Sequence, residues 1–296
     1  MTEQRITFKS DGLDIAGVVR VPGDLAAGER RPAFIVLHGF GSNMNSESVL
    51  EPSKLFEELG YVSLRFDMRG CGDSGGEKGR VICLEQVTDT RNALTFLSQR
   101  SDVDPTRIAL IGSSFGAAVA IYTAGVDKRV AACISSGGWG DGERKFRGQH
   151  AGPEAWAKFT AMLEEGKRHR ARTGQSLMVP RYDIVPIPEH LRGNLAQKSI
   201  QMFPAETAQS MFDFRADDVV GDIAPRPLLL LHSSSDSVTP TEQSVALFLR
   251  ANQPTDLHLF AETDHFMFAE SNGRVRRVLL DWLNKYFSSE ATAAPA

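Results

Sequence analysis

One short segment of the chain combines a hydroxyl group with the turn that would expose it. Gly112-Ser113-Ser114-Phe115-Gly116 follows the apolar run 108–111 and precedes the small-residue stretch 117–124. The apolar run predicts a buried strand, and the small-residue stretch predicts a helix. Glycines permit a sharp reversal between the two, which would lift Ser114 above the sheet edge. The segment therefore predicts a nucleophilic serine, and a glycine-rich turn in which Ser114 only caps the helix is the plainer alternative.

A serine hydroxyl attacks a carbonyl poorly unless a base removes its proton, so a base must lie nearby. Imidazole suits that task near neutral pH, and a carboxylate can hold it in one tautomer. Asp236 follows the apolar run 227–232, and His265 follows the run 257–260. In a parallel sheet, the loops after the strands share one edge. We therefore expect Ser114, Asp236 and His265 to converge, although they are far apart in the sequence.

Several other side chains could take these roles. They are Ser113, His38, His232, Asp264, Asp217, Asp218 and Cys71. Ser113 has the wrong offset from the two glycines, and the two histidines end predicted strands, where they are expected to pack or to bond their own loops. Asp264 adjoins His265, and adjacent side chains in an extended turn point apart. Cys71 lacks an elbow, whereas Asp217 and Asp218 stay open as weaker substitutes for Asp236.

The predicted elements that position these residues alternate between strand and helix. An antiparallel hairpin is expected at 5–21, and strands are expected at 33–37, 61–66, 108–111, 130–134, 227–232 and 257–260. Helices are expected near 50–59, 84–97, 117–124, 242–249 and 275–287, with a polar turn at 102–105. This alternation predicts a doubly wound, mostly parallel α/β sheet that is covered on both faces.

Residues 139–210 interrupt the alternation. They contain charged helical stretches, a proline-rich piece at 180–188 and seven large apolar residues: Trp139, Trp156, Phe159, Met162, Met178, Met202 and Phe203. We predict that 139–210 forms a lid over the strand ends and that 1–138 and 211–296 form the core; an ordinary helical excursion is the alternative. The basic cluster Lys167-Arg168-His169-Arg170, with Arg172, is expected to be a solvated helix face and not an anion site.

These motifs resemble the α/β-hydrolase family, and in particular bacterial esterases and acyl hydrolases of the feruloyl-esterase-like and dienelactone-hydrolase-like kind. The resemblance covers residues 1–137 and about 215–288. It runs through His38-Gly39-Phe40-Gly41, Asp67-Met68-Arg69-Gly70, 112–116, 236–240 and Asp264-His265. One departure is Ser233-Ser234-Ser235 before Asp236, where the family usually has a glycine.

The resemblance implies a role for each site residue. Ser114 would be the nucleophile, His265 the general base and acid, and Asp236 the carboxylate that orients the imidazole. The backbone N–H groups of Phe40 and Phe115 would form the oxyanion hole. The function that follows is a serine hydrolase that cleaves a carboxylic ester through an acyl-enzyme, with no metal or organic cofactor required. The apolar lid residues favour a hydrophobic or aromatic small-molecule substrate.

Other functions use the same parts. The predicted triad could cleave an amide or a carbon–carbon bond beside a ketone, or transfer the acyl group to another acceptor. A non-catalytic binding module of the same fold is a more remote alternative. The sequence does not name the substrate or the oligomeric state, and a homodimer is compatible with it.

Composition and cysteine content narrow the partners and the cellular locations that are expected for this chain. The chain has 296 residues, 42% of them hydrophobic, and a formal net charge of -4, which gives no reason to expect nucleic acid or a membrane as partner. No signal peptide or membrane span is expected. Cys71, Cys83 and Cys133 lack CxxC spacing and predict free thiols, hence a cytoplasmic location. The glycines at 70, 72 and 75 match a dinucleotide fingerprint, but no helix follows directly, so a structural loop is expected.

Overall fold

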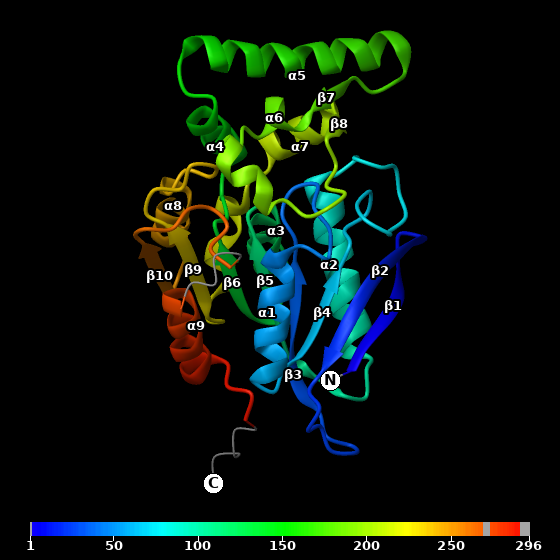
Figure 1. Cartoon of the computed structure of the whole chain (residues 1–296), viewed down its shortest axis with the longest axis vertical. Helices are drawn as coiled ribbons and strands as arrows, with labels where there is room; N and C mark the ends of the chain where they lie inside the picture. The colour runs from blue at the N-terminus through cyan, green and yellow to red at the C-terminus, as the bar shows by residue number, and fades with distance from the viewer. Residues whose placement is uncertain (1, 269–272, 291–296) are drawn as a thin grey trace.

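A computed structural model describes residues 2–268 and 273–290 of the chain. Its centre is an eight-stranded sheet in the order β1-β2-β4-β3-β5-β6-β9-β10 (Figure 1). The strands are β1 (Thr2–Ser10), β2 (Leu13–Val21), β3 (Arg31–Leu37), β4 (Val62–Phe66), β5 (Val103–Ser113), β6 (Val130–Ser136), β9 (Leu228–Ser233) and β10 (Thr255–Phe260). β1 and β2 form the expected antiparallel hairpin, β2 also runs antiparallel to β4, and all other pairs are parallel. The prediction of a mostly parallel α/β sheet is confirmed.

Helices cover both faces of the sheet because its central strands are apolar on both sides. Phe34 and Val36 of β3 pack in the cluster that includes α1 (Glu47–Glu58) and α9 (Gly273–Tyr286). Ile35 and Leu37 point to the opposite face and pack in the cluster of the remaining core helices. These helices are α2 (Cys83–Ser98), α3 (Phe115–Val126) and α8 (Glu242–Arg250). The alternation along β3 places Leu37 at the strand end, immediately before the loop that reaches the candidate site.

β5 is longer than the sequence predicts. The expected polar turn at 102–105 is wrong beyond residue 102, because β5 already begins at Val103. Val103 is fully buried and pairs with Arg31 of β3, and the register then shifts before Ala33 meets Ile108. Burial of Val103 and this bulge allow the strand to include Pro105, which a regular central strand would not accommodate.

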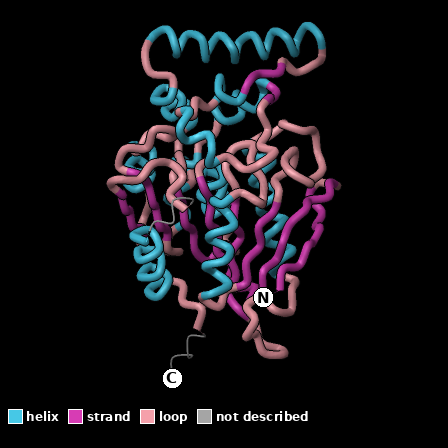
Figure 2. Tube along the Cα trace, viewed as in Figure 1, coloured by secondary structure: helices cyan, strands magenta, loops and turns pink. Residues whose placement is uncertain are grey.

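Between β6 and β9 the chain leaves the sheet and forms a layer beyond the strand ends (Figure 1). Its elements are α4 (Gly142–Gln149), α5 (Pro153–Thr173), β7 (Met178–Pro180), α6 (Arg181–Ile184), η1 (Glu189–Asn194), β8 (Met202–Pro204) and α7 (Ala205–Asp213). On the way back to β9, the short helices η2 (Ala216–Asp218) and η3 (Val220–Ile223) pack against α3. β7 and β8 pair as a separate antiparallel ribbon. Loops gather between this layer and the sheet (Figure 2), so the layer faces the ends of the strands that carry the predicted site residues.

The long helix α5 carries the basic cluster on its exposed surface. Lys167 and Arg168 form ion pairs with Glu164 and Glu165 on the same helix. Such exposed pairs contribute little to stability, and the cluster is a solvated helix face, as expected. Among the described residues, no helix combines the length and the apolar character needed to cross a membrane.

Candidate active site

The turn between β5 and α3 holds Ser114 in a strained backbone conformation. Its φ is 55° and its ψ is −114°, a region that residues other than glycine rarely occupy. A Cβ at Gly112 would overlap the backbone of Gly116, and a Cβ at Gly116 would lie 2.5 Å from the carbonyl oxygen of Leu37. Gly112 is therefore required for the reversal, and Gly116 is required for the close approach of α3 to the end of β3. Ser113 still belongs to β5, so the elbow residue is Ser114, as the motif predicts.

His265 and Asp236 are joined by a short hydrogen bond. Nδ1 of His265 lies 2.8 Å from Oδ2 of Asp236, and the two side chains are at most 3% exposed. Since the carboxylate accepts, Nδ1 donates, and the lone pair of the neutral ring is on Nε2. This is the tautomer that a general base needs.

Ser114 and His265 line the same small cavity at the end of the sheet, with a volume of about 40 Å³. The described residues contain no hydrogen bond between the Ser114 hydroxyl and the imidazole. In ligand-free enzymes such contacts are often long and tighten only when substrate is bound. The structure thus brings all three predicted side chains to one edge of the sheet and joins two of them directly.

The carboxylate of Asp236 is surrounded by donors. Oδ1 accepts the N–H groups of Val238 at 2.8 Å and Thr239 at 2.7 Å. Oδ2 lies 3.2 Å from Nε2 of His232, in addition to its bond with His265. Burial alone would raise the pKa of Asp236, but attraction by His265 and hydrogen bonds from both histidines outweigh it, so the pKa lies well below the usual range. Asp236 is therefore held in its ionised form.

The two other histidines at strand ends are fixed in their loops, as expected. Nε2 of His38 accepts the N–H of Met68 at 3.1 Å, so its Nδ1 donates to the Gly39 carbonyl at 2.8 Å. Burial lowers the pKa of His38, which keeps it neutral in this role. His232 is also fully buried, but it contacts Asp236 and so belongs to the site more closely than the sequence predicts.

The loop after β3 places the Phe40 backbone beside the elbow. A Cβ at Gly39 would lie 3.7 Å from Cβ of Ser114, and the rings of Phe40 and Phe115 are 6.1 Å apart. Within residues 2–268 and 273–290, neither the Phe40 N–H nor the Phe115 N–H donates to another group of the protein. The Phe115 N–H also opens helix α3, whose N-terminus favours negative charge. Both N–H groups are thus available to a ligand.

The cavity wall combines polar and apolar residues, and its apolar residues differ from those that the sequence suggests. It includes Phe40, Val185, Ile187, Leu195, Val238 and Phe266. None of the seven large apolar residues expected to favour an apolar substrate lines this cavity: Trp139, Phe159 and Phe203 are buried in packing, whereas Met178 and Met202 are exposed. Sequence reasoning also missed Arg181, a buried cation in the same wall, because no local motif marks it.

The remaining candidates have other partners. Asp217 accepts a hydrogen bond from Arg144 at 2.8 Å, and Asp218 lies 4.0 Å from Arg215. Asp264 accepts the backbone N–H and the hydroxyl of Ser237 at 2.9 and 2.7 Å, which ties the two site loops together.

The three cysteines are free and buried. Burial raises the pKa of the Cys71 thiol to about 12, so it is not a thiolate nucleophile.

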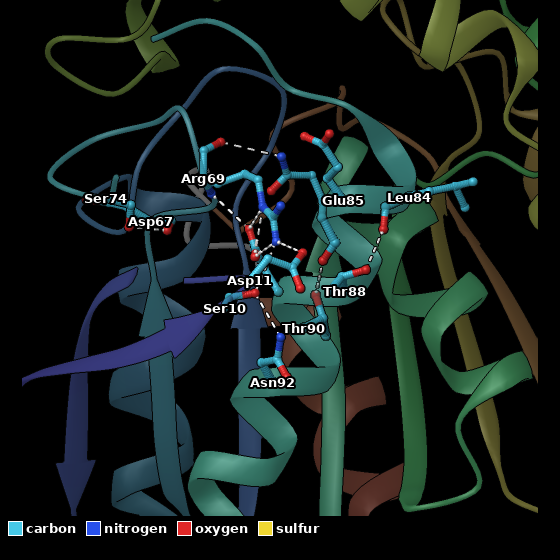
Figure 3. Close-up of polar contacts among 12 residues, drawn as sticks. Ser10, Asp11, Asp67, Arg69, Ser74, Leu84, Glu85, Thr88, Thr90 and Asn92 are labelled. Carbon is cyan, nitrogen blue, oxygen red and sulfur yellow. Dashed lines mark hydrogen bonds and ion pairs between the residues drawn. The ribbon is translucent and has the colours of Figure 1, made fainter. Parts of the chain in front are cut away.

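In the glycine-rich loop after β4, the carboxylate of Asp67 accepts backbone hydrogen bonds. Asp67 accepts the N–H groups of Asp73 at 2.7 Å and Met44 at 2.6 Å. Arg69 points towards Ser10 and Asp11, which it contacts at 3.1 and 2.9 Å (Figure 3). These contacts hold the loop to the hairpin and to the segment after β3. In the described part of the chain, no group of three or more His, Cys, Asp or Glu side chains could hold a metal ion.

Comparison with known proteins agrees with this fold. The model of the alpha/beta hydrolase family matches residues 34–278. A thiohydrolase from Eupenicillium brefeldianum is 37% identical over 283 residues, which cover 88% of this chain and 87% of that protein. The polyketide transferase grgF from Penicillium sp. is 26% identical over 295 residues, or 94% of each chain.

Solved structures share the fold. The crystal structure of the Penicillium alpha/beta hydrolase GrgF superposes with a TM-score of 0.77 at 23% identity, covering 96% of this chain and 97% of that one. Est1E from Butyrivibrio proteoclasticus, solved with ferulic acid bound, gives a TM-score of 0.66 at 17% identity, covering 94% and 99%. With the elbow, the strand order and the matched family model, the chain belongs to the alpha/beta hydrolase family.

Proposed function

We propose that this protein is a serine hydrolase that cleaves carboxylic esters of apolar or aromatic small molecules through an acyl-enzyme. The observation that carries the proposal is the 2.8 Å bond from His265 to the ionised Asp236, beside a cavity that also contains Ser114. This arrangement gives the imidazole the correct tautomer to take a proton from a hydroxyl. It needs no group outside the chain.

In the proposed mechanism, Oγ of Ser114 attacks the substrate carbonyl while Nε2 of His265 takes its proton. The oxyanion is bound by the backbone N–H groups of Phe40 and Phe115, which have no other partner in the described structure. His265 then donates its proton to the leaving alcohol. Water, deprotonated by the same imidazole, releases the acid from Ser114.

We also propose that residues 139–210 act as a lid on a core formed by 1–138 and 211–296. Val185, Ile187 and Leu195 of this segment close the cavity, whose volume of about 40 Å³ has room for very few water molecules. A substrate must therefore displace part of this wall on entry. The apolar part of the wall supports the preference for an apolar acyl or alcohol group.

Acyl transfer and thioester cleavage form the second candidate. A relative that is 37% identical is named a thiohydrolase, and another is named a polyketide transferase. Both reactions use the same acyl-enzyme and differ in the leaving group or in the acceptor. We further propose a cytoplasmic location, which the buried free thiols support.

The test is a substrate panel at matched acyl chains: aryl and alkyl esters, thioesters, anilides and β-diketones, each with and without an added alcohol acceptor. We expect ester hydrolysis to be fastest and to disappear in Ser114→Ala. Cleavage of thioesters alone, or product formation only with the added alcohol, would instead support the second candidate. Hydrolysis of the diketones alone would contradict the ester assignment.

A further inference from the structure

Arg181 is a buried cation, and burying a charge costs free energy. It begins α6 in the layer above the sheet, it is 1% exposed, and within the described residues it forms no ion pair. Burial lowers the pKa of its guanidinium to about 10, which still leaves it charged at neutral pH. A buried, unpaired cation destabilises a fold unless its donors are satisfied, so its hydrogen bonds indicate what it does.

The guanidinium donates to three backbone carbonyls. Nη1 reaches the oxygen of Phe40 and Nη2 that of Gly41, both at 2.9 Å, and Nε reaches that of Ile200 at 2.8 Å. Its Cζ lies 5.4 Å from the ring centroid of Phe40 and 5.6 Å from that of Phe203. The planar fork thus grips two consecutive carbonyls of the loop after β3, a geometry that a lysine cannot reproduce.

The two carbonyls belong to the loop that carries the Phe40 N–H. The peptide between Gly39 and Phe40 is already held on one side, because the Gly39 carbonyl accepts from Nδ1 of His38 at 2.8 Å and from the N–H of Ser42 at 3.1 Å. Arg181 fixes the peptides that follow. Contacts on both sides therefore leave the peptide between Gly39 and Phe40 little freedom to rotate.

Gly41 shows how closely this contact is fitted. Its φ is +54°, and a Cβ there would lie 2.9 Å from Nη2 of Arg181 and would overlap the ring of Phe203. A residue with a side chain there would have to displace the ring of Phe203 and crowd the guanidinium of Arg181. The close approach is built into the backbone as well as into the arginine.

We propose that Arg181 is the positioning residue of the oxyanion hole: it holds the Phe40 and Gly41 carbonyls so that the Phe40 N–H stays aimed at the oxyanion on Ser114. This inference rests on the proposed function. It adds that the oxyanion hole is completed by the layer above the sheet and not by the sheet alone. Preorganised donors of this kind act mainly on the transition state.

The experiment compares Arg181→Met and Arg181→Lys with a matched control, Arg226→Met. Arg226 also donates to backbone carbonyls, those of Ala124, Asp127, Val130 and Asp222, but it does not line the cavity that contains Ser114. For Arg181→Met we expect kcat on the best ester to fall about 10²–10³-fold, the range for loss of an oxyanion donor, with KM changed less than about threefold. Arg181→Lys should lose less, and Arg226→Met should keep kcat within about twofold although its thermal midpoint falls.

Two further measurements separate positioning from general damage. A boronic acid that forms a tetrahedral adduct with Ser114 should bind Arg181→Lys more weakly in proportion to the loss of kcat/KM, whereas the product acid should bind unchanged. If Arg181→Met does not fold, the inference is judged on Arg181→Lys alone, provided that its circular dichroism spectrum matches that of the wild type. Unchanged kcat, a loss confined to KM, or equal weakening of boronate and product would overturn the inference. If the wild type neither hydrolyses esters nor binds the boronate, the proposed function itself has failed.

Discussion

Nε2 of His232 lies 3.2 Å from Oδ2 of Asp236, the oxygen that also accepts the hydrogen bond of His265. The same Nε2 lies 3.0 Å from the carbonyl oxygen of Thr239. A carbonyl can only accept, so Nε2 carries the proton, and the Nδ1 of the neutral ring accepts from the Ser244 hydroxyl at 2.6 Å. His232 thus fixes the carboxylate that orients the proposed base.

Replacement of His232 by phenylalanine removes the donor to Asp236 and keeps an aromatic ring in the site. Loss of a hydrogen bond to a charged group typically costs about 1.5–3 kcal/mol, so kcat/KM should fall roughly 10- to 100-fold. His232→Gln, whose amide can still donate, should retain more activity than His232→Phe. Steady-state kinetics on one ester checks this order, and equal activity of both variants and the wild type would show that His232 only fills space.

Asp236 and Asp264 have different hydrogen-bond partners: Asp236 accepts from the imidazole of His265, and Asp264 accepts from Ser237. Asp236→Asn should lower kcat about 10⁴-fold, as expected when the carboxylate that sets the imidazole tautomer is lost. Asp264→Asn keeps an acceptor for the Ser237 hydroxyl and should lose less than about tenfold. Parallel kinetics of the two folded variants gives the comparison. A larger loss from Asp264→Asn would exchange their proposed roles.

Ile187 and Val238 both line the catalytic cavity and a larger hollow of about 810 Å³. Ile187→Ala should remove part of the wall between the two and favour longer acyl chains, because fitting one methylene is worth about 1–3 kcal/mol. We expect the ratio of kcat/KM for octanoyl over acetyl esters to rise about tenfold or more. Leu191→Ala is the matched control: Leu191 is a buried residue of the same layer outside that wall, and its loss should lower stability but leave the ratio unchanged.

Because of Lys145, we expect the free energy of unfolding to depend on pH. Its side chain is buried, with Nζ 3.8 Å from the ring centroid of Phe146, and burial lowers its pKa to about 7. Between pH 7 and the ordinary lysine range, the unfolded chain binds the proton that the folded chain has lost, so this residue makes unfolding free energy rise with pH. Lys145→Met should therefore be more stable than the wild type at pH 7, by a few kcal/mol.

Urea unfolding at several pH values checks the sign of that effect. The advantage of Lys145→Met should shrink steadily as the pH rises from 7 towards 10.5 and should be constant below about 7. An advantage that grows with pH, or a variant less stable than the wild type at every pH, would contradict the account of Lys145 as a buried, costly cation.

The parts of the fold and site that could be predicted from sequence are those with a local signal. The alternation of apolar runs with helical spacing predicts the parallel sheet, and Gly112 and Gly116 mark the elbow because only glycine fits there. Parallel topology then brings Asp236 and His265 to the same edge without further information. The sequence does not predict that β5 starts at Val103. Whether a valine among polar residues is buried depends on its pairing with a distant strand, here at Arg31 of β3.

The wall of the cavity has no such local signal. Arg181 contacts a carbonyl 141 positions earlier in the chain, and neither partner belongs to a motif that would pair them. Large apolar residues such as Trp139 and Phe203 look suited to a substrate pocket by type, but the layer above the sheet uses them for its own packing. Which residues of a lid face the core depends on how its helices fold back, and periodicity alone does not specify that.

The most direct test of the central claim, that Ser114 is a nucleophile activated by His265, is mass spectrometry of the intact protein and of its peptides after reaction with a fluorophosphonate. The folded wild type should gain one phosphonyl adduct, on the peptide that contains Ser114. Ser114→Ala should gain none, with ester kcat at least about 10³-fold lower, and His265→Ala should react far more slowly. A folded wild type without an adduct, or an equal adduct in Ser114→Ala, would contradict the account.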